Sequence, residues 1–203
     1  MPDHALPAPA ATDPERRTWL IATGAAGGAA AVATAVPFVK TFTPSERAKA
    51  MGAPVEVDLA DLPPGGMKTV EWRGKPVWVL RRTPEMLAQL EKNAGFLADP
   101  ESKSAKQPDY VKGVARAIKP EVFVAVGVCT HLGCSPTLKK EVGAASDMGG
   151  DWPGGYYCPC HNSRFDLSGR VFNGSPAPTN LDIPPHRYVN DKVVVVGEDS
   201  KGA

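Results

Sequence analysis

The sequence predicts a mostly β head domain with one inserted helix, carried on a single N-terminal membrane-spanning helix. Three observations support this fold class. Residues 18–39 contain no charged side chain, and a helix of that length reaches about 33 Å, enough to cross a hydrocarbon core of roughly 30 Å. Beyond residue 54, short apolar runs alternate with the turn-forming segments PPGG and RGKP. The 203 residues include 20 Gly and 21 Pro, which favours turns and short strands over long helices.

The N-terminal part is predicted to be a tail followed by an export signal and membrane anchor. Residues 1–14 are rich in Pro and Ala, so we expect a disordered tail. Arg16-Arg17 immediately precedes the uncharged run, which resembles a twin-arginine export signal. We assign residues 15–39 to a signal that stays as a transmembrane anchor, with a cytoplasmic N-terminus. A cleaved signal is the alternative, because Ala33-Thr34-Ala35 offers a cleavage site.

A linker and a head domain are expected to follow the anchor. Residues 40–54 are assigned to a flexible hinge linker without regular structure, because they contain the helix breakers Pro44, Gly52 and Pro54. Residues 55–203 are assigned to the head. The strands expected there cover 55–59, 67–72, 76–82, 121–128 and 192–197, and the helix covers 84–93 with Thr83 as its N-cap. The fourth of these strands is apolar on both faces, which predicts a central position in its sheet.

The balance of charges argues against some classes of partner. The chain has 23 basic and 22 acidic residues, a formal net charge of +1. No basic excess favours nucleic-acid binding, and no acidic excess favours a disordered solvating chain. We therefore expect no nucleic acid among the partners.

Two short loops gather the side chains that carry chemistry. All four cysteines lie between residues 129 and 160, in the segments CTHLGC and CPCHNS, and each segment supplies two cysteines and one histidine. A structural zinc takes four ligands, often from pairs spaced C-x₂-C, and neither segment has that spacing. A 2Fe–2S cluster with two Cys and two His ligands leaves two cysteines that can bridge the loops. A structural zinc module stays as the non-redox alternative.

The two segments resemble the Rieske iron–sulfur family. The pattern C-T-H-x-G-C followed by C-P-C-H-x-S is similar to the cluster-binding loops of that family, and the extra cysteine in each loop is similar to its respiratory form. The segment GSPAP at 174–178 resembles the proline-rich loop that covers the cluster. The anchor, the linker and the β head also match, so the resemblance covers essentially the whole chain.

The resemblance implies one Rieske-type Cys₂His₂ 2Fe–2S cluster. Cys129 and Cys158 would hold one iron and His131 and His161 the other. Four cysteines allow three pairings, and the resemblance selects a disulfide between the remaining two, Cys134 and Cys160. Replacing two anionic thiolates by neutral imidazoles raises the potential from about −400 mV to roughly −150 to +300 mV, which lets the centre accept an electron from a quinol. An imidazole ligand can also take a proton, so His131 and His161 are the expected catalytic residues.

Several neighbouring residues are expected to form the environment of the cluster. Ser163 resembles the family's serine that donates a hydrogen bond to a bridging sulfide, and Leu132 resembles its exposed docking leucine. Phe165 stands where many respiratory members carry Tyr, so one tuning hydrogen bond is expected to be missing. Asn162 replaces the commoner Gly, for which the sequence offers no energetic account. The other expected members are Gly133, Gly174, Pro176 and Pro178. His186 is expected at the surface.

The function implied is that of an electron carrier in a bacterial cytochrome bc1 complex. Such a subunit would take an electron and a proton from ubiquinol at cytochrome b and swing on its linker to cytochrome c1. It would lie in the inner membrane with a periplasmic head, within a dimeric multi-subunit complex. Rieske ferredoxins and oxygenase components usually lack the two extra cysteines, the signal and the anchor. The small Rieske subunit of a periplasmic oxidase such as arsenite oxidase, with its signal cleaved, stays as an alternative.

Overall fold

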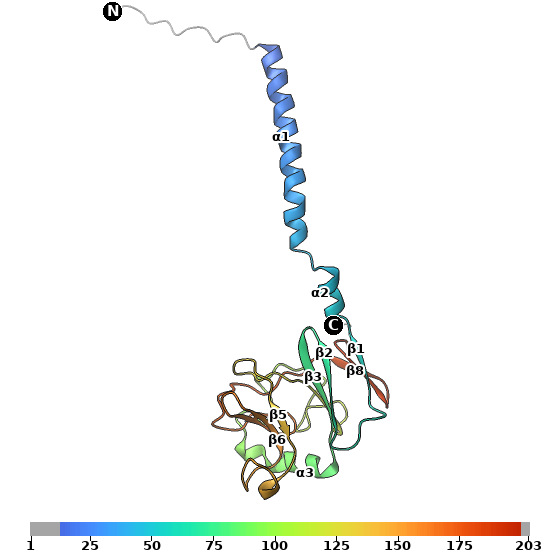
Figure 1. The fold of residues 1–203 in the computed structure, drawn as a ribbon, viewed down its shortest axis with the longest axis vertical. Helices are drawn as coiled ribbons and strands as arrows, with labels where there is room; N and C mark the ends of the chain where they lie inside the picture. Colours follow the sequence, from blue (N-terminus) through green and yellow to red (C-terminus); the bar gives the residue numbers. More distant parts are fainter. Residues whose placement is uncertain (1–12, 200–203) are drawn as a thin grey trace, which may run out of the picture. The chain divides into compact units, whose positions relative to one another are not determined.

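A long N-terminal helix opens the structure, which is a computed structural model describing residues 13–199 (Figure 1). Helix α1 covers Pro14–Thr41, and the Asp13 carboxylate caps it by accepting a hydrogen bond from the backbone N–H of Glu15. Most of the expected tail, residues 1–12, lies outside the described residues. The hydroxyl groups of Thr18, Thr23 and Thr34 each donate to a backbone carbonyl one turn earlier. Their polar atoms therefore need no partner outside the helix.

One helical segment of the described residues is long and apolar enough to cross a membrane. An 18-residue window within Pro14–Met51 has a mean hydropathy of 1.5, and none of that window is buried against the rest of the protein. An apolar helix of this length suits a lipid environment. The expected membrane-spanning helix is therefore present by length and composition.

The linker contains a helix that the sequence analysis did not expect. Helix α2 covers Glu46–Met51 within the segment assigned to an irregular hinge. The sequence ERAKAM consists of good helix formers, and the Ser45 hydroxyl accepts the backbone N–H of Ala48 at the N-terminal end. The expectation of no regular structure in 40–54 is wrong, because the helix breakers lie on either side of residues 46–51 and not among them. The chain divides into two compact units between Lys49 and Ala50, inside this helix.

Three antiparallel sheets build the described part of the head (Figure 1). Their strand orders are β1-β9-β8, β2-β3-β4 and β5-β6-β7. The first sheet consists of β1 (Val55–Asp58), β9 (Val193–Val196) and β8 (His186–Asn190). The second consists of β2 (Met67–Trp72), β3 (Lys75–Arg81) and β4 (Val122–Val126), and the third of β5 (Thr137–Lys139), β6 (Gly155–Cys158) and β7 (Ser163–Phe165). The five strands expected from the sequence are thus confirmed.

Helix α3 and two short 3₁₀ helices complete the head. Helix α3 covers Pro84–Lys92, and the Thr83 hydroxyl accepts the backbone N–H of Met86. This confirms the expected cap and helix. The 3₁₀ helices are η1 (Ala94–Phe96) and η2 (Gly143–Ala145).

The β2-β3-β4 sheet separates two apolar cores. Alternate residues of β3 face opposite sides, so Trp78 lies in the core that also contains Cys129 and Cys158, whereas Val77 lies in the core formed with β1 and β9. Strand β4 divides its residues in the same way. This explains why β4 is apolar on both faces, although it is the outermost strand of its sheet and not the expected central one. Beyond β4, the backbone N–H of Val126 bonds to the carbonyl of Asp182 in a loop.

His186 is buried and does not lie at the surface as the sequence analysis expected. Its side chain is 1% exposed. The Nδ1 atom lies 2.9 Å from the carbonyl oxygen of Pro184, and the ring meets Tyr110 edge-on. Burial lowers the pKa of His186 below its ordinary value. Tyr110 contacts it from 76 positions earlier in the chain, which is why local sequence did not reveal the burial.

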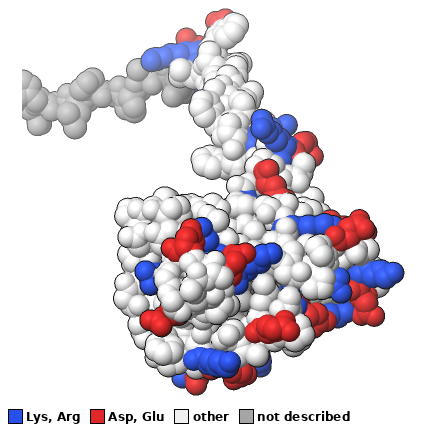
Figure 2. Space-filling view, turned by 60° about the horizontal axis from the view of Figure 1, so that its bottom comes forward, with Lys and Arg blue, Asp and Glu red and all other residues white. Residues whose placement is uncertain are grey.

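Charged side chains of both signs lie side by side on one face of the head. Figure 2 shows Lys and Arg side chains lying beside Asp and Glu side chains on the face in view, without a large region of one sign. This distribution matches the near-zero net charge of the sequence.

Candidate metal centre

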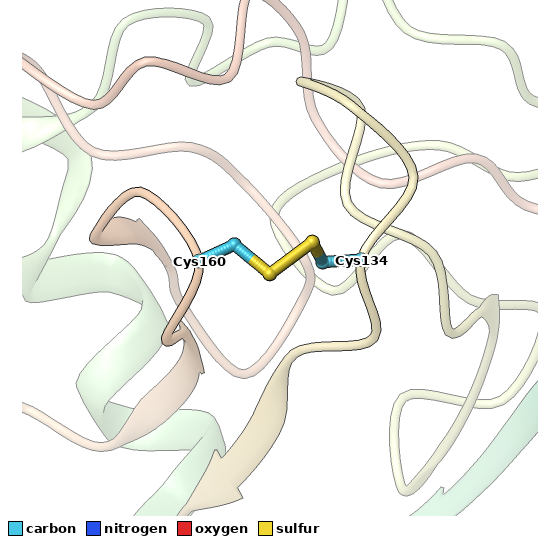
Figure 3. The surroundings of a disulfide bond; sticks show 2 residues. All are labelled: Cys134 and Cys160. Atoms are coloured by element: carbon cyan, nitrogen blue, oxygen red, sulfur yellow. A yellow bond between two sulfur atoms is a disulfide. The ribbon is translucent and has the colours of Figure 1, made fainter.

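The two cysteine–histidine loops meet in the head and are joined by a disulfide. Cys134 of the first loop is bonded to Cys160 of the second, with their Cα atoms 6.6 Å apart (Figure 3). The first loop follows β4, and the second connects β6 to β7. This is the pairing that the resemblance implied. The bond fixes two loops that are 26 residues apart in sequence.

The two remaining cysteines lie side by side. Cys129 and Cys158 are each 2% exposed and have no disulfide partner. The backbone N–H of Cys129 donates to the carbonyl of Cys134, which closes the first loop, and the N–H of Asn162 donates to the carbonyl of Cys158 in the second. Burial raises the pKa of the Cys129 thiol, although hydrogen bonds from the His131 backbone and the Ser163 side chain oppose this. Burial therefore favours the neutral thiol of Cys129 over its thiolate.

The two histidines of the loops also come together. The rings of His131 and His161 lie with their centroids 4.7 Å apart and their planes at 90°. The Nδ1 atom of His131 is buried without a hydrogen-bond partner in the described structure. Buried polar atoms nearly always have a partner, and a metal ion would satisfy this one. His161 is exposed.

These residues fit an iron–sulfur cluster. The site offers two buried thiols, two imidazoles in contact, and an unpartnered buried ring nitrogen. Thiolate and imidazole are the protein ligands of a Rieske-type centre. Proximity alone would also group the sulfur atoms of Cys134, Cys158 and Cys160, which lie within 4.8 Å of one another. Two of those sulfurs are spent in the disulfide, so this trio offers only one thiolate.

A third segment, the proline-rich loop at 174–178, is tied to both cysteine–histidine loops. The Ser163 hydroxyl accepts the backbone N–H of Ala177 (3.1 Å), which ties it to the second loop. The Thr130 hydroxyl of the first loop donates to the carbonyl of Thr179 (2.6 Å), the residue that directly follows this segment. The sequence analysis did not identify Thr130 as part of the site, and only its position between Cys129 and His131 could have indicated this.

Comparison with known proteins identifies the domain. The family model for the Rieske [2Fe-2S] domain matches residues 54–185. The chain belongs to the Rieske family. The Rieske fold and the 2Fe–2S cofactor expected from the sequence are therefore confirmed.

The relatives found by sequence resemble this Rieske chain over nearly its whole length. It is 55% identical to the ubiquinol-cytochrome c reductase iron-sulfur subunit of Allochromatium vinosum, over 93% of this chain and 90% of that protein. It is 42% identical to the mitochondrial Rieske subunit of the cytochrome b-c1 complex of Neurospora crassa, over 86% of this chain and 66% of that protein. Among solved structures, a chain of a hyperthermophilic respiratory Complex III matches with a TM-score of 0.46 and 26% identity, covering 85% of this chain and 97% of that one.

The predicted environment of the Rieske centre is partly buried and partly exposed. Ser163 and Phe165 are completely buried on β7. Leu132, by contrast, is 70% exposed at the tip of the first loop, where a large apolar side chain can contact a partner. The remaining predicted members are exposed, and they are Gly133, Gly174, Pro176 and Pro178.

The structure gives a reason for Asn162, which the sequence left unexplained. Its backbone has a φ of +63°, in the left-handed region that favours Gly and, after Gly, Asn. Asn162 therefore keeps the backbone conformation that the commoner Gly provides. Its side-chain oxygen also accepts a hydrogen bond from the Tyr157 hydroxyl of β6, a contact that Gly lacks. Tyr157 is a site residue that the sequence analysis missed, because its role depends on Asn162.

Proposed function

We propose that this chain is the membrane-anchored iron–sulfur subunit of a ubiquinol–cytochrome c reductase. The observation that carries the proposal is the Cys134–Cys160 disulfide between the two loops. Ferredoxin and oxygenase Rieske components usually lack these cysteines. The whole-length similarity to named reductase subunits supports the same assignment and makes the chain part of an oxidoreductase complex.

Four side chains are proposed to hold the cofactor. Cys129 and Cys158 would bind one iron, since both are buried thiols next to each other. His131 and His161 would bind the other, since their rings are in contact. When bound, a Rieske cluster supplies a one-electron acceptor with a potential of roughly −150 to +300 mV. The disulfide would hold the two ligand loops in a fixed relation around it.

The histidines are proposed to couple the electron to a proton. Ligation through the buried Nδ1 of His131 would leave its Nε2 to hold a proton. His161 is exposed, so it can reach a substrate hydroxyl at the tip of the domain. Ubiquinol is the substrate proposed, bound at cytochrome b, with the exposed Leu132 contacting that partner. Electron delivery to cytochrome c1 would follow.

The N-terminal segments are proposed to anchor and orient the subunit. Helix α1 would span the bacterial inner membrane once, with the N-terminus in the cytoplasm and the head in the periplasm, after export through the twin-arginine signal. Residues 40–54 would let the head move between cytochrome b and cytochrome c1. The complete complex would be dimeric and would couple quinol oxidation to proton translocation.

Two measurements test this proposal. The first is purification from membranes, in which we expect cytochromes b and c1 to accompany the protein. The second is the intact mass of the mature protein, which should retain residues 15–39. A protein that begins after Ala35 and purifies with a different oxidoreductase would instead support the periplasmic oxidase alternative. A zinc content without iron or a visible spectrum would exclude both.

A further inference from the structure

Three arginine side chains lie in the interior of the head beside a single carboxylate. Arg82, Arg116 and Arg170 are at most 3% exposed, and Asp166 is completely buried. Asp166 is the only carboxylate of residues 13–199 within ion-pairing distance of these three groups, and it pairs with Arg170 at 2.7 Å. We call these four residues the buried arginine cluster. Three cations beside one anion leave an excess of positive charge where charges are normally paired.

Neutral backbone carbonyls hold the two arginines that lack an ion pair. Arg82 donates to the carbonyl oxygens of Pro120, Ala115 and Leu167 and to the Ser168 hydroxyl. Arg116 donates to the Gln107 side chain and to the carbonyls of Ser168, Gly169 and Leu181. These bonds satisfy the donors but cancel no charge.

Both of these arginines stay charged at neutral pH. Burial lowers the pKa of Arg82 and of Arg116 to about 10, which is still well above neutrality. The carboxylates of Asp99 and Asp182 also face Arg116 without forming an ion pair with it. Both residues are half-buried, so solvent weakens their effect and the excess of positive charge is reduced but not removed.

The buried arginine cluster is hydrogen-bonded to backbone that directly follows the second cysteine–histidine loop and β7. Its bonds converge on the turn 166–170, which directly follows β7 and so begins three residues after Ser163, about 10 Å along an extended chain. The carbonyl of Gly169 also accepts the backbone N–H of Leu181, just beyond the proline-rich loop. The Arg82 guanidinium lies 5.1 Å from the ring of Phe123, which shares its core with Cys129 and Cys158.

We propose that the buried arginine cluster raises the reduction potential of the metal centre through its uncompensated positive charge. The inference rests on the proposed cofactor ligation. Reduction adds one negative charge to the centre, and a positive charge nearby in a medium of low dielectric favours that state. Salt screens buried charges much less than surface charges. The contribution should therefore persist at high ionic strength.

Matched substitutions separate charge from structure. Arg82→Gln and Arg82→Lys both lose the guanidinium hydrogen bonds, but only the first loses the charge. We expect the midpoint potential of the purified 2Fe–2S protein to be clearly lower in Arg82→Gln than in Arg82→Lys, at both 50 mM and about 500 mM salt. Equal potentials in the two variants would overturn the proposal. So would a difference that disappears at high salt.

For a third variant we expect the midpoint potential to shift in the opposite direction. Asp166→Asn removes the one anion of the cluster, so we expect a higher midpoint than in the wild type. A lower midpoint would mean that distortion dominates and would contradict the proposal. If Arg82→Gln does not fold, Arg116→Gln and Arg116→Lys provide the same comparison. The potential is measured on the isolated subunit, so failure to co-purify with cytochromes would refute the proposed function without affecting this result.

Discussion

The hydroxyl group of Ser163, which is completely buried, accepts the backbone N–H of Ala177 at 3.1 Å. A hydroxyl that accepts this bond keeps its own hydrogen to donate elsewhere. The Cys129 thiol lies within hydrogen-bonding reach of this hydroxyl, because the Ser163 side chain lowers the pKa of Cys129. The proline-rich loop therefore orients a donor toward Cys129, one of the proposed sulfur ligands.

Removal of this donor should lower the midpoint potential. A hydrogen bond to sulfur stabilises the reduced, more negative state. Losing one net bond of about 1 kcal/mol corresponds to roughly 40 mV for a one-electron couple, at 59 mV per tenfold change. We expect Ser163→Ala to lower the midpoint by about this amount in a redox titration followed by EPR. Ser146→Ala, in the turn after η2, is the control and should leave it unchanged. An unchanged midpoint in Ser163→Ala would argue against donation.

A substitution at Phe165 that adds a hydrogen-bond donor should raise the midpoint potential. This residue is completely buried on β7, two positions after Ser163, and its ring cannot donate a hydrogen bond. Phe165→Tyr supplies a hydroxyl near the cysteine ligands, so the midpoint should rise by roughly 40 mV. Phe96→Tyr adds the same hydroxyl at an exposed position and serves as the control. No change or a fall in Phe165→Tyr would contradict the assigned position of Phe165 beside the cluster.

The pH dependence of the midpoint tests histidine ligation. If His131 and His161 hold an iron, loss of an imidazole proton adds negative charge to the centre and disfavours reduction. The midpoint should therefore fall as the pH rises from neutral into the alkaline range. The measurement is a redox titration at a series of pH values. A midpoint that stays flat over this range would exclude histidine ligands.

The sequence alone predicted the family, its cofactor and the disulfide between the loops, because the residues that indicate them lie close together in the chain. The candidate ligands and their spacing lie within two six-residue segments. The start of α3 is likewise indicated by the adjacent residues Thr83 and Pro84. The features that it missed depend on distant partners. Arg116 lies in a polar stretch that resembles a surface loop, yet its guanidinium reaches Ser168 and Leu181. His186 is covered by Tyr110 in the same way.

His186 should make the stability of the head depend on acid. Burial lowers its pKa in the folded state below the ordinary value of 6.5, and its Nε2 atom lacks a partner among the described residues. The unfolded chain therefore binds a proton first, and the free energy of unfolding should fall as the pH drops below about 6.5 toward the lower folded-state pKa. Denaturant unfolding at pH 7.5 and 5.5 measures this. His186→Gln should lose part of the difference between the two pH values, and an equal difference would assign the acid sensitivity to other groups.

The bond between Tyr157 and Asn162 should hold the second ligand loop in place. Asn162 directly follows His161, and its side chain is tied to β6 through the Tyr157 hydroxyl. Tyr157→Phe removes only that hydroxyl, so we expect faster loss of the cluster on dilution and broader EPR lines from a less uniform His161. Asn162→Gly keeps the left-handed backbone but removes the acceptor, and should give the same result without an added effect in the double variant. Tyr188→Phe is the matched control, because that hydroxyl has no hydrogen-bond partner within residues 13–199. Additive effects of Tyr157→Phe and Asn162→Gly would show that the two residues act separately.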